Sequence, residues 1–493
     1  MLFSSPVFIF LFLPISFFVY FFLNKIRIVY AGKVWLVACS LFFYGYWDVS
    51  YLPLLLGSIL FNFTLGWAVS PHTKGLRLPA TRKALLTFAI IVNLSLLGYY
   101  KYTNFFIENF NDLTGYELTF RNIILPLGIS FYTFTQTAFL VDSYRGSAKE
   151  YDFVNYALFV TFFPHLIAGP ILHHKEMMTQ FQSKWTCAVR YRNIFMGLFI
   201  FCIGLFKKVV IADNFAVFAN EGFAPGALHD FFSSWATSLS YTFQLYFDFS
   251  GYCDMAIGAA LLFNIWLPLN FNSPYKSLEI QDFWRRWHIT LGRYLRDYVY
   301  IPLGGNRCSS ARIYFNLFAT FVLGGLWHGA SWMFIIWGAM HGGALVIHRW
   351  WKQRGFEMPT VMAWFITFMF VNVAWVFFRA HSIDDALRIL AGMLDLKSIN
   401  SLTMSDVPTN MIAWGGSFLD NFTGKLPAGI VANLLCYILI IIGFIITPFK
   451  NAYEMTISKG NHGIKTVWMV VLFTCAVYTT IKSTNTVFLY FNF

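Results

Sequence analysis

The sequence predicts an all-α protein that crosses a membrane several times. Apolar residues make up 58% of the 493-residue chain and charged residues only 12%, whereas soluble domains average about 25% charged residues. The mean hydropathy is +0.58. Apolar runs of about the length of a membrane span occur in both the N-terminal and the C-terminal part of the chain. We therefore expect one membrane domain over residues 1–493 and no soluble domain.

The first apolar run is Val7–Leu23. It has neither a basic segment before it nor a small-residue cleavage site after it, so we expect a retained helix. Cytoplasmic loops are enriched in Lys and Arg, and Pro71–Lys83, with four basic residues and no acid, is the clearest such loop. The orientation that it sets gives further spans at Val34–Tyr46, Leu54–Val69 and Ala84–Tyr100, then an outer loop at Thr103–Phe120.

The middle of the chain, Arg121–Arg312, has short and interrupted apolar pieces. Examples are Phe153–Ile167 and Ile194–Phe206, and Gly and Pro recur between such pieces. Non-helical backbone at membrane depth requires protein or water around it. We expect tilted or re-entrant segments here.

The C-terminal part is again regular. Charge asymmetry places spans at Val361–Phe378, Gly429–Thr447 and Val467–Ile481, with an outer loop from Arg379 to Gly429. The tail, residues 482–493, then lies on the outer side.

The strongest candidate for chemistry is His328, in the apolar run Leu323–Trp332. An ionisable side chain inside a membrane is by default a functional hypothesis. About 15 apolar residues precede its turn and about 18 follow, fewer than the roughly 20 of a full span. Basic residues close both ends. Either His328 lines an internal cavity, or two ordinary helices meet at the far interface.

The densest polar segment is Asp282–Asp297. Read as one helix, it places its tryptophans on one face and its arginines elsewhere, as in an interfacial helix. Its arginines, with polar residues just after it, either hold a phosphorylated donor or anchor the helix to anionic lipid. The donor-binding candidates are Arg285, Arg286, Asn306 and Arg307.

His288, in the same segment, is the second candidate for catalysis, because a buried neutral imidazole can act as a base. Asp248 and Asp254 lie in an apolar run with Ser250. No GxSxG motif is present, and a carboxylate in such a run more often pairs with an arginine. We assign both aspartates a supporting role.

The chain ends in the aromatic sequence Thr486–Phe493. Termini are usually polar and mobile, so we expect these aromatic side chains to pack. Tyr490 carries a phenol that can act as a nucleophile, or it anchors the tail at the membrane interface.

The net charge of +12 follows the loops and does not indicate nucleic acid. A basic cytoplasmic face would also attract a polyanionic donor, such as a coenzyme A thioester or an acyl carrier. The seven cysteines show no metal-ligand spacing. We expect no disulfide, metal or tightly bound cofactor.

Several motifs resemble the membrane-bound O-acyltransferases. Phe283–His288, Tyr300–Arg307 and Gly324–Gly329 carry this resemblance. Leu245–Tyr252 and Phe163–Pro170 make the chain similar to the bacterial branch. That branch contains the membrane subunits that O-acetylate alginate, peptidoglycan and cellulose, and the D-alanyl exporter of teichoic acids.

The resemblance implies a funnel-like ring of transmembrane and re-entrant helices in the bacterial cytoplasmic membrane. His328 matches the membrane histidine of the family, the presumed base, His288 the second motif histidine, and Tyr490 a tyrosine that relays the acyl group. Trp327 belongs to the His328 motif. The donor is a cytoplasmic acetyl thioester, acetyl-CoA or a carrier. The partners are an extracytoplasmic serine-hydrolase-type transferase and a cell-envelope polysaccharide.

Two other classes remain open. A transporter also has broken helices and buried histidines, and a lipid O-acyltransferase is the alternative within the same family. Thioester cleavage separates the first from an enzyme, and the identity of the acceptor separates the second.

Overall fold

The computed structural model describes residues 1–72, 78–148, 152–227, 229–400, 428–458 and 460–482, together with Leu489. These residues form helices and loops and no strand, which confirms the predicted all-α class. Six helical segments among them are long and apolar enough to cross a membrane, so the chain is a multi-pass membrane protein. It divides into two compact units, Met1–Phe201 with Met255–Pro268, and Cys202–Asp254 with Leu269–Phe493.

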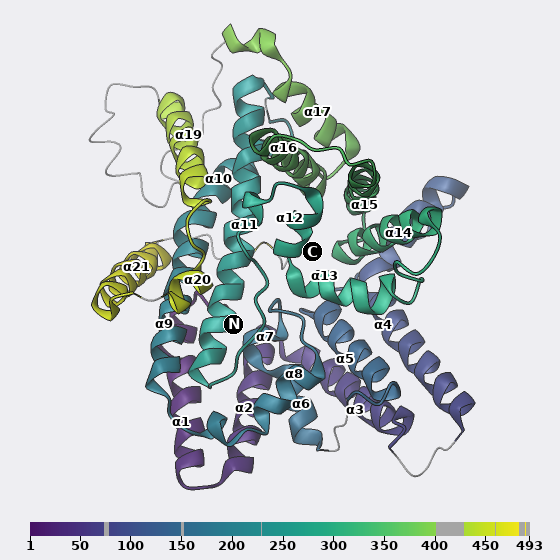
Figure 1. Cartoon of the computed structure of the whole chain (residues 1–493), viewed down its shortest axis with the longest axis vertical. Helices are drawn as coiled ribbons and strands as arrows, with labels where there is room; N and C mark the ends of the chain where they lie inside the picture. Colours follow the sequence, from purple (N-terminus) through teal and green to yellow (C-terminus); the bar gives the residue numbers. More distant parts are fainter. Residues whose placement is uncertain are drawn as a thin grey trace. The chain divides into compact units, whose positions relative to one another are not determined.

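The first unit is a set of packed helices. α1 and α2 lie side by side at the purple end of the chain (Figure 1). α5 packs against both α3 and α4. The helices that begin in this unit are α1 (Leu13–Lys25), α2 (Val29–Gly45), α3 (Leu52–Val69), α4 (Pro79–Thr114), α5 (Ile129–Tyr144), α6 (Phe153–Thr161), α7 (Phe163–Leu166), α8 (His174–Phe181) and α9 (Tyr191–Phe206).

Buried amide side chains hold these helices together. The Nδ2 group of Asn62 on α3 donates to Asn93 Oδ1 on α4 at 3.0 Å, and Asn93 Nδ2 donates back at 2.7 Å. Gln136 on α5 donates to Ser58 Oγ at 2.9 Å. Such bonds stabilise helix contacts in a bilayer, where lipid offers these groups no partner.

The second unit contains the segments with the histidine motifs. A π-helical turn, Lys207–Ala212, joins α9 to α10, so that helix continues from Tyr191 to Gly222. The helices that begin in this unit are α10 (Asp213–Gly222), α11 (Phe231–Leu262), α12 (Ile280–Arg286), α13 (Ile289–Leu295), α14 (Ser310–His328), α15 (Trp332–Gln353), α16 (Thr360–Arg379), α17 (Ile383–Met393), α19 (Ala428–Ile446), α20 (Ala452–Ile457) and α21 (His462–Lys482).

Helices α14 and α15 pack with their backbones in close approach. A Cβ atom on Gly338 of α15 would overlap the carbonyl oxygen of Phe321, and one on Gly325 of α14 would overlap that of Phe334. Glycine at both positions therefore sets the distance between the two helices. Gly325 lies three residues before His328, so this close contact lies next to the end of α14.

Most of the predicted spans correspond to helices, but two boundaries were wrong. The loop expected from Thr103 begins later, because α4 continues to Thr114. The short piece Ile194–Phe206 belongs to the longer helix Tyr191–Gly222. The outer loop expected from Arg379 to Gly429 stays a prediction: it includes the short helix α17, capped by Ser382, and its residues 401–427 lie outside the described residues.

Candidate functional site

His328 is the last residue of α14, and its side chain is buried at 4% exposure. Gly329 follows in an extended conformation, and α15 begins at Trp332. The predicted turn after His328 is thus confirmed. The imidazole contacts aromatic rings: its centroid lies 4.9 Å from that of Trp327, 5.1 Å from Trp337 and 5.2 Å from Phe378.

His288 lies beside His328. Their ring centroids are 6.5 Å apart, and His288 is completely buried. The ring centroid of Trp327, the residue before His328, lies 6.3 Å from that of His288. The structure therefore brings together three of the residues that the sequence singled out: His288, Trp327 and His328. Because both imidazoles are enclosed by protein, a substrate group must be desolvated to reach them.

The segment around His288 differs from the prediction of a single interfacial helix over Asp282–Asp297. The helix stops after Arg286 and resumes at Ile289, because His288 adopts the left-handed conformation with φ +43°. A non-glycine residue in this region is strained, and such strain is often found at functional sites. The imidazole that follows this break is completely buried.

Asn270, which sequence reasoning missed, is the hydrogen-bond partner of His288. The side-chain oxygen of Asn270 lies 3.1 Å from His288 Nδ1. His288 lies outside the candidate membrane spans. Burial lowers its pKa, so the neutral imidazole is favoured. The signal available in the sequence was an amide between apolar neighbours, Leu269 and Phe271.

A third histidine, His341 on α15, also packs against these aromatic rings. His341 is completely buried, and Trp284 Nε1 donates to its Nδ1 at 3.2 Å. Trp337 lies between the two histidines of these helices, 5.1 Å from His328 and 4.9 Å from His341.

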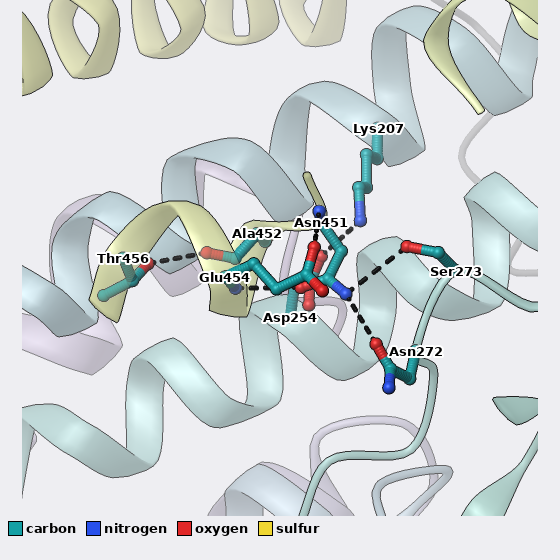
Figure 2. Close-up of polar contacts among 8 residues, drawn as sticks. All are labelled: Lys207, Asp254, Asn272, Ser273, Asn451, Ala452, Glu454 and Thr456. Atoms are coloured by element: carbon teal, nitrogen blue, oxygen red, sulfur yellow. Dashed lines mark hydrogen bonds and ion pairs between the residues drawn. The ribbon is translucent and has the colours of Figure 1, made fainter. Parts of the chain in front are cut away.

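The two aspartates of α11 form ion pairs with consecutive lysines. Lys207 Nζ lies 2.7 Å from Asp254 Oδ2 (Figure 2), and Lys208 Nζ lies 2.9 Å from Asp248 Oδ1 and 2.5 Å from Asp213 Oδ1. The expected arginine partners were wrong. Both lysines lie on the π-helical turn, and this turn directs them to α11.

Asp248 also contacts the C-terminal segment. The backbone N–H of Leu489 donates to Asp248 Oδ2 at 3.1 Å, and Leu489 is buried at 8% exposure. Tyr490, the predicted relay residue, lies outside the described residues. Leu489, the residue before it, lies next to α11.

The remaining candidates lie apart from the buried pair. Arg285, Asn306 and Arg307 are exposed. Arg286 is half-buried and pairs with Asp282 at 2.8 Å. Asn306 accepts from the Tyr300 hydroxyl at 2.8 Å. These are surface groups, whereas the histidines belong to the interior.

A model of the membrane-bound O-acyltransferase family matches residues 41–383 of this chain. The chain is 46% identical to a peptidoglycan O-acetyltransferase of Helicobacter pylori, over 100% of this chain and 98% of that protein. It is 41% identical to a probable alginate O-acetylase of Pseudomonas aeruginosa, over 84% and 80% of the two chains. It is 30% identical to a teichoic acid D-alanyltransferase of Bacillus subtilis, over 52% and 69%.

Proposed function

The chain belongs to the membrane-bound O-acyltransferase family, and we propose that it moves acetyl groups across the bacterial cytoplasmic membrane for O-acetylation of a cell-envelope polysaccharide. It is an acyltransferase, and its relatives include enzymes named for acetylation of peptidoglycan and of alginate. The peptidoglycan relative matches over the whole chain. This favours peptidoglycan as the acceptor over alginate or cellulose.

The observation that carries the proposal is the pair of buried imidazoles, His288 and His328, with ring centroids 6.5 Å apart. Acyl transfer to a hydroxyl needs a base that removes its proton. A neutral imidazole can do this, and the aromatic rings around His328 exclude water that would hydrolyse the thioester.

In the proposed reaction the donor is a cytoplasmic acetyl thioester, acetyl-CoA or an acyl carrier, and no bound cofactor takes part. One imidazole of the pair takes the proton of an acceptor hydroxyl. The oxygen attacks the thioester carbonyl, and a tetrahedral oxyanion forms. The C–S bond then breaks, and the thiolate leaves and takes up the proton.

We further propose that the first acceptor is the phenol of Tyr490. The bond from Leu489 to Asp248 supports this, since it holds the preceding residue against α11 at 3.1 Å. The tyrosyl ester then passes its acetyl group to an extracytoplasmic transferase of the serine-hydrolase type, which modifies the polysaccharide.

The test uses purified protein in proteoliposomes with acetyl-CoA labelled in the acetyl group. We expect release of free coenzyme A, measured with a thiol reagent, and transfer of label when the partner transferase and glycan fragments are added. Passage of a substrate without thioester cleavage would identify a transporter instead. Label recovered in lipid would identify a lipid acyltransferase.

A further inference from the structure

Asn270 lies in the loop between α11 and α12 and is completely buried. Its atoms face three consecutive residues: His288, in the break between α12 and α13, and the first two residues of α13. Its backbone oxygen accepts from Ile289 N at 3.0 Å. Its side-chain oxygen accepts from Thr290 N at 3.2 Å and from Thr290 Oγ1 at 3.0 Å, and it faces His288 Nδ1 at 3.1 Å. One residue thus holds the left-handed turn in place.

The orientation of the Asn270 amide follows from its neighbours. The backbone N–H of Thr290 can only donate, so the group that faces it must be the oxygen. The amide nitrogen then points to Cys253 on α11, whose sulfur lies 3.4 Å away and serves as a weak acceptor. Both sides of the amide agree on one assignment.

This orientation determines which nitrogen of His288 carries the proton. The carbonyl oxygen of Asn270 can only accept, so His288 Nδ1 must be the protonated nitrogen that donates to it. In a neutral imidazole the other nitrogen, Nε2, then has a lone pair and no proton.

We propose that Asn270 is a positioning residue that holds His288 in the Nδ1–H tautomer, so that Nε2 is the proton acceptor that His288 contributes to the imidazole pair. The proposal rests on the proposed function, since it specifies how one member of that pair takes part. During transfer the hydroxyl proton moves to Nε2, and the resulting imidazolium keeps its Nδ1–H bond to Asn270. The proton later leaves with the thiolate. A ring held in the wrong tautomer would present N–H, which cannot act as a base.

The first test reads the tautomer directly. The protein is labelled with ¹⁵N-histidine in nanodiscs, and the His288 signal is identified as the one missing from His288→Gln. Couplings between each ring nitrogen and the ring protons show which nitrogen is protonated. We expect Nδ1–H in the unmodified protein, and an Nε2–H signal there would overturn the proposal.

The second test uses three variants in the coenzyme A release assay. Asn270→Leu keeps the size of the side chain but removes the acceptor, so kcat falls about tenfold or more while KM for the donor stays unchanged. Asn270→Asp keeps an acceptor at the same place and retains more activity than Asn270→Leu. Asn272→Leu is the matched control, because that side chain lies in the same loop but accepts from Asn451 at 2.9 Å (Figure 2).

Equal losses in Asn272→Leu and Asn270→Leu would show a role in loop structure only, and would overturn the proposal. The outcome is separable from that of the proposed function. If His288→Ala keeps full activity, the assignment of the site is wrong. If His288→Ala is inactive but Asn270→Leu matches the unmodified protein, only the role of Asn270 is wrong.

Discussion

The imidazole rings of His288 and His328 lie with their centroids 6.5 Å apart, although the two residues belong to separate helical segments. His288 reaches this position from a left-handed break between α12 and α13, and His328 reaches it from the end of α14. Each is enclosed by aromatic rings. In the proposed reaction, two imidazoles so close together act on the same substrate group.

We therefore expect His288→Ala and His328→Ala each to abolish coenzyme A release while the protein still inserts. The double variant should be no worse than either single one, because residues that act as a unit are not additive. His381→Ala, a change at an exposed histidine after α16, is the control and should keep normal activity. Partial activity in both single variants, with a further drop in the double one, would contradict a shared role.

Tyr490→Phe should abolish a covalent acetyl adduct on the C-terminal segment, because the phenol oxygen is the proposed nucleophile. The adduct is measured by mass spectrometry of the C-terminal peptide after incubation with labelled acetyl-CoA. The control, Tyr478→Phe, changes an exposed tyrosine of α21 and should leave the adduct unchanged. An adduct that persists in Tyr490→Phe would mean that the relay residue is a different one.

Lys208→Met should destabilise the protein more than Lys207→Met. Lys208 neutralises two carboxylates, Asp213 and Asp248, whereas Lys207 pairs with Asp254. Removal of one partner from a buried ion pair typically costs about 3–5 kcal/mol, because the other charge is left without compensation. Thermal unfolding of the purified variants in detergent measures the difference, and equal midpoints would contradict it.

Gly338→Ala should lower stability and activity together. The added methyl group would meet the backbone of α14 at Phe321, and overpacking of this kind typically costs about 1–3 kcal/mol. Gly343→Ala on the same helix is the matched control, since its methyl group would meet nothing within 4 Å. The two variants are compared by unfolding midpoint and by coenzyme A release. If Gly343→Ala is the more damaging, close packing of α14 on α15 is not what matters.

Composition and the length of apolar runs were enough to predict the helical membrane class, and the turn after His328 could be placed because apolar runs of known length flank it. The break at His288 could not be predicted. The sequence of Asp282–Asp297 is compatible with one continuous helix. The hydrogen bonds that stabilise the break come from Asn270, outside that segment. Local propensity contains no information about such a partner.

The two buried aspartates of α11 also separate what the sequence predicts from what only the fold decides. The sequence by itself determined that Asp248 and Asp254, in an apolar run, need cationic partners, because an unpaired buried charge is too costly. Only the tertiary structure decided that these are Lys207 and Lys208, since the π-helical turn that directs them depends on how the helices pack. Likewise the sequence identified both histidines as candidates, whereas their meeting depends on contacts between segments distant along the chain. The cost of burying a charged group can be estimated from the residue and its sequence neighbours. The distance between two segments far apart in the sequence is set only by the packed fold.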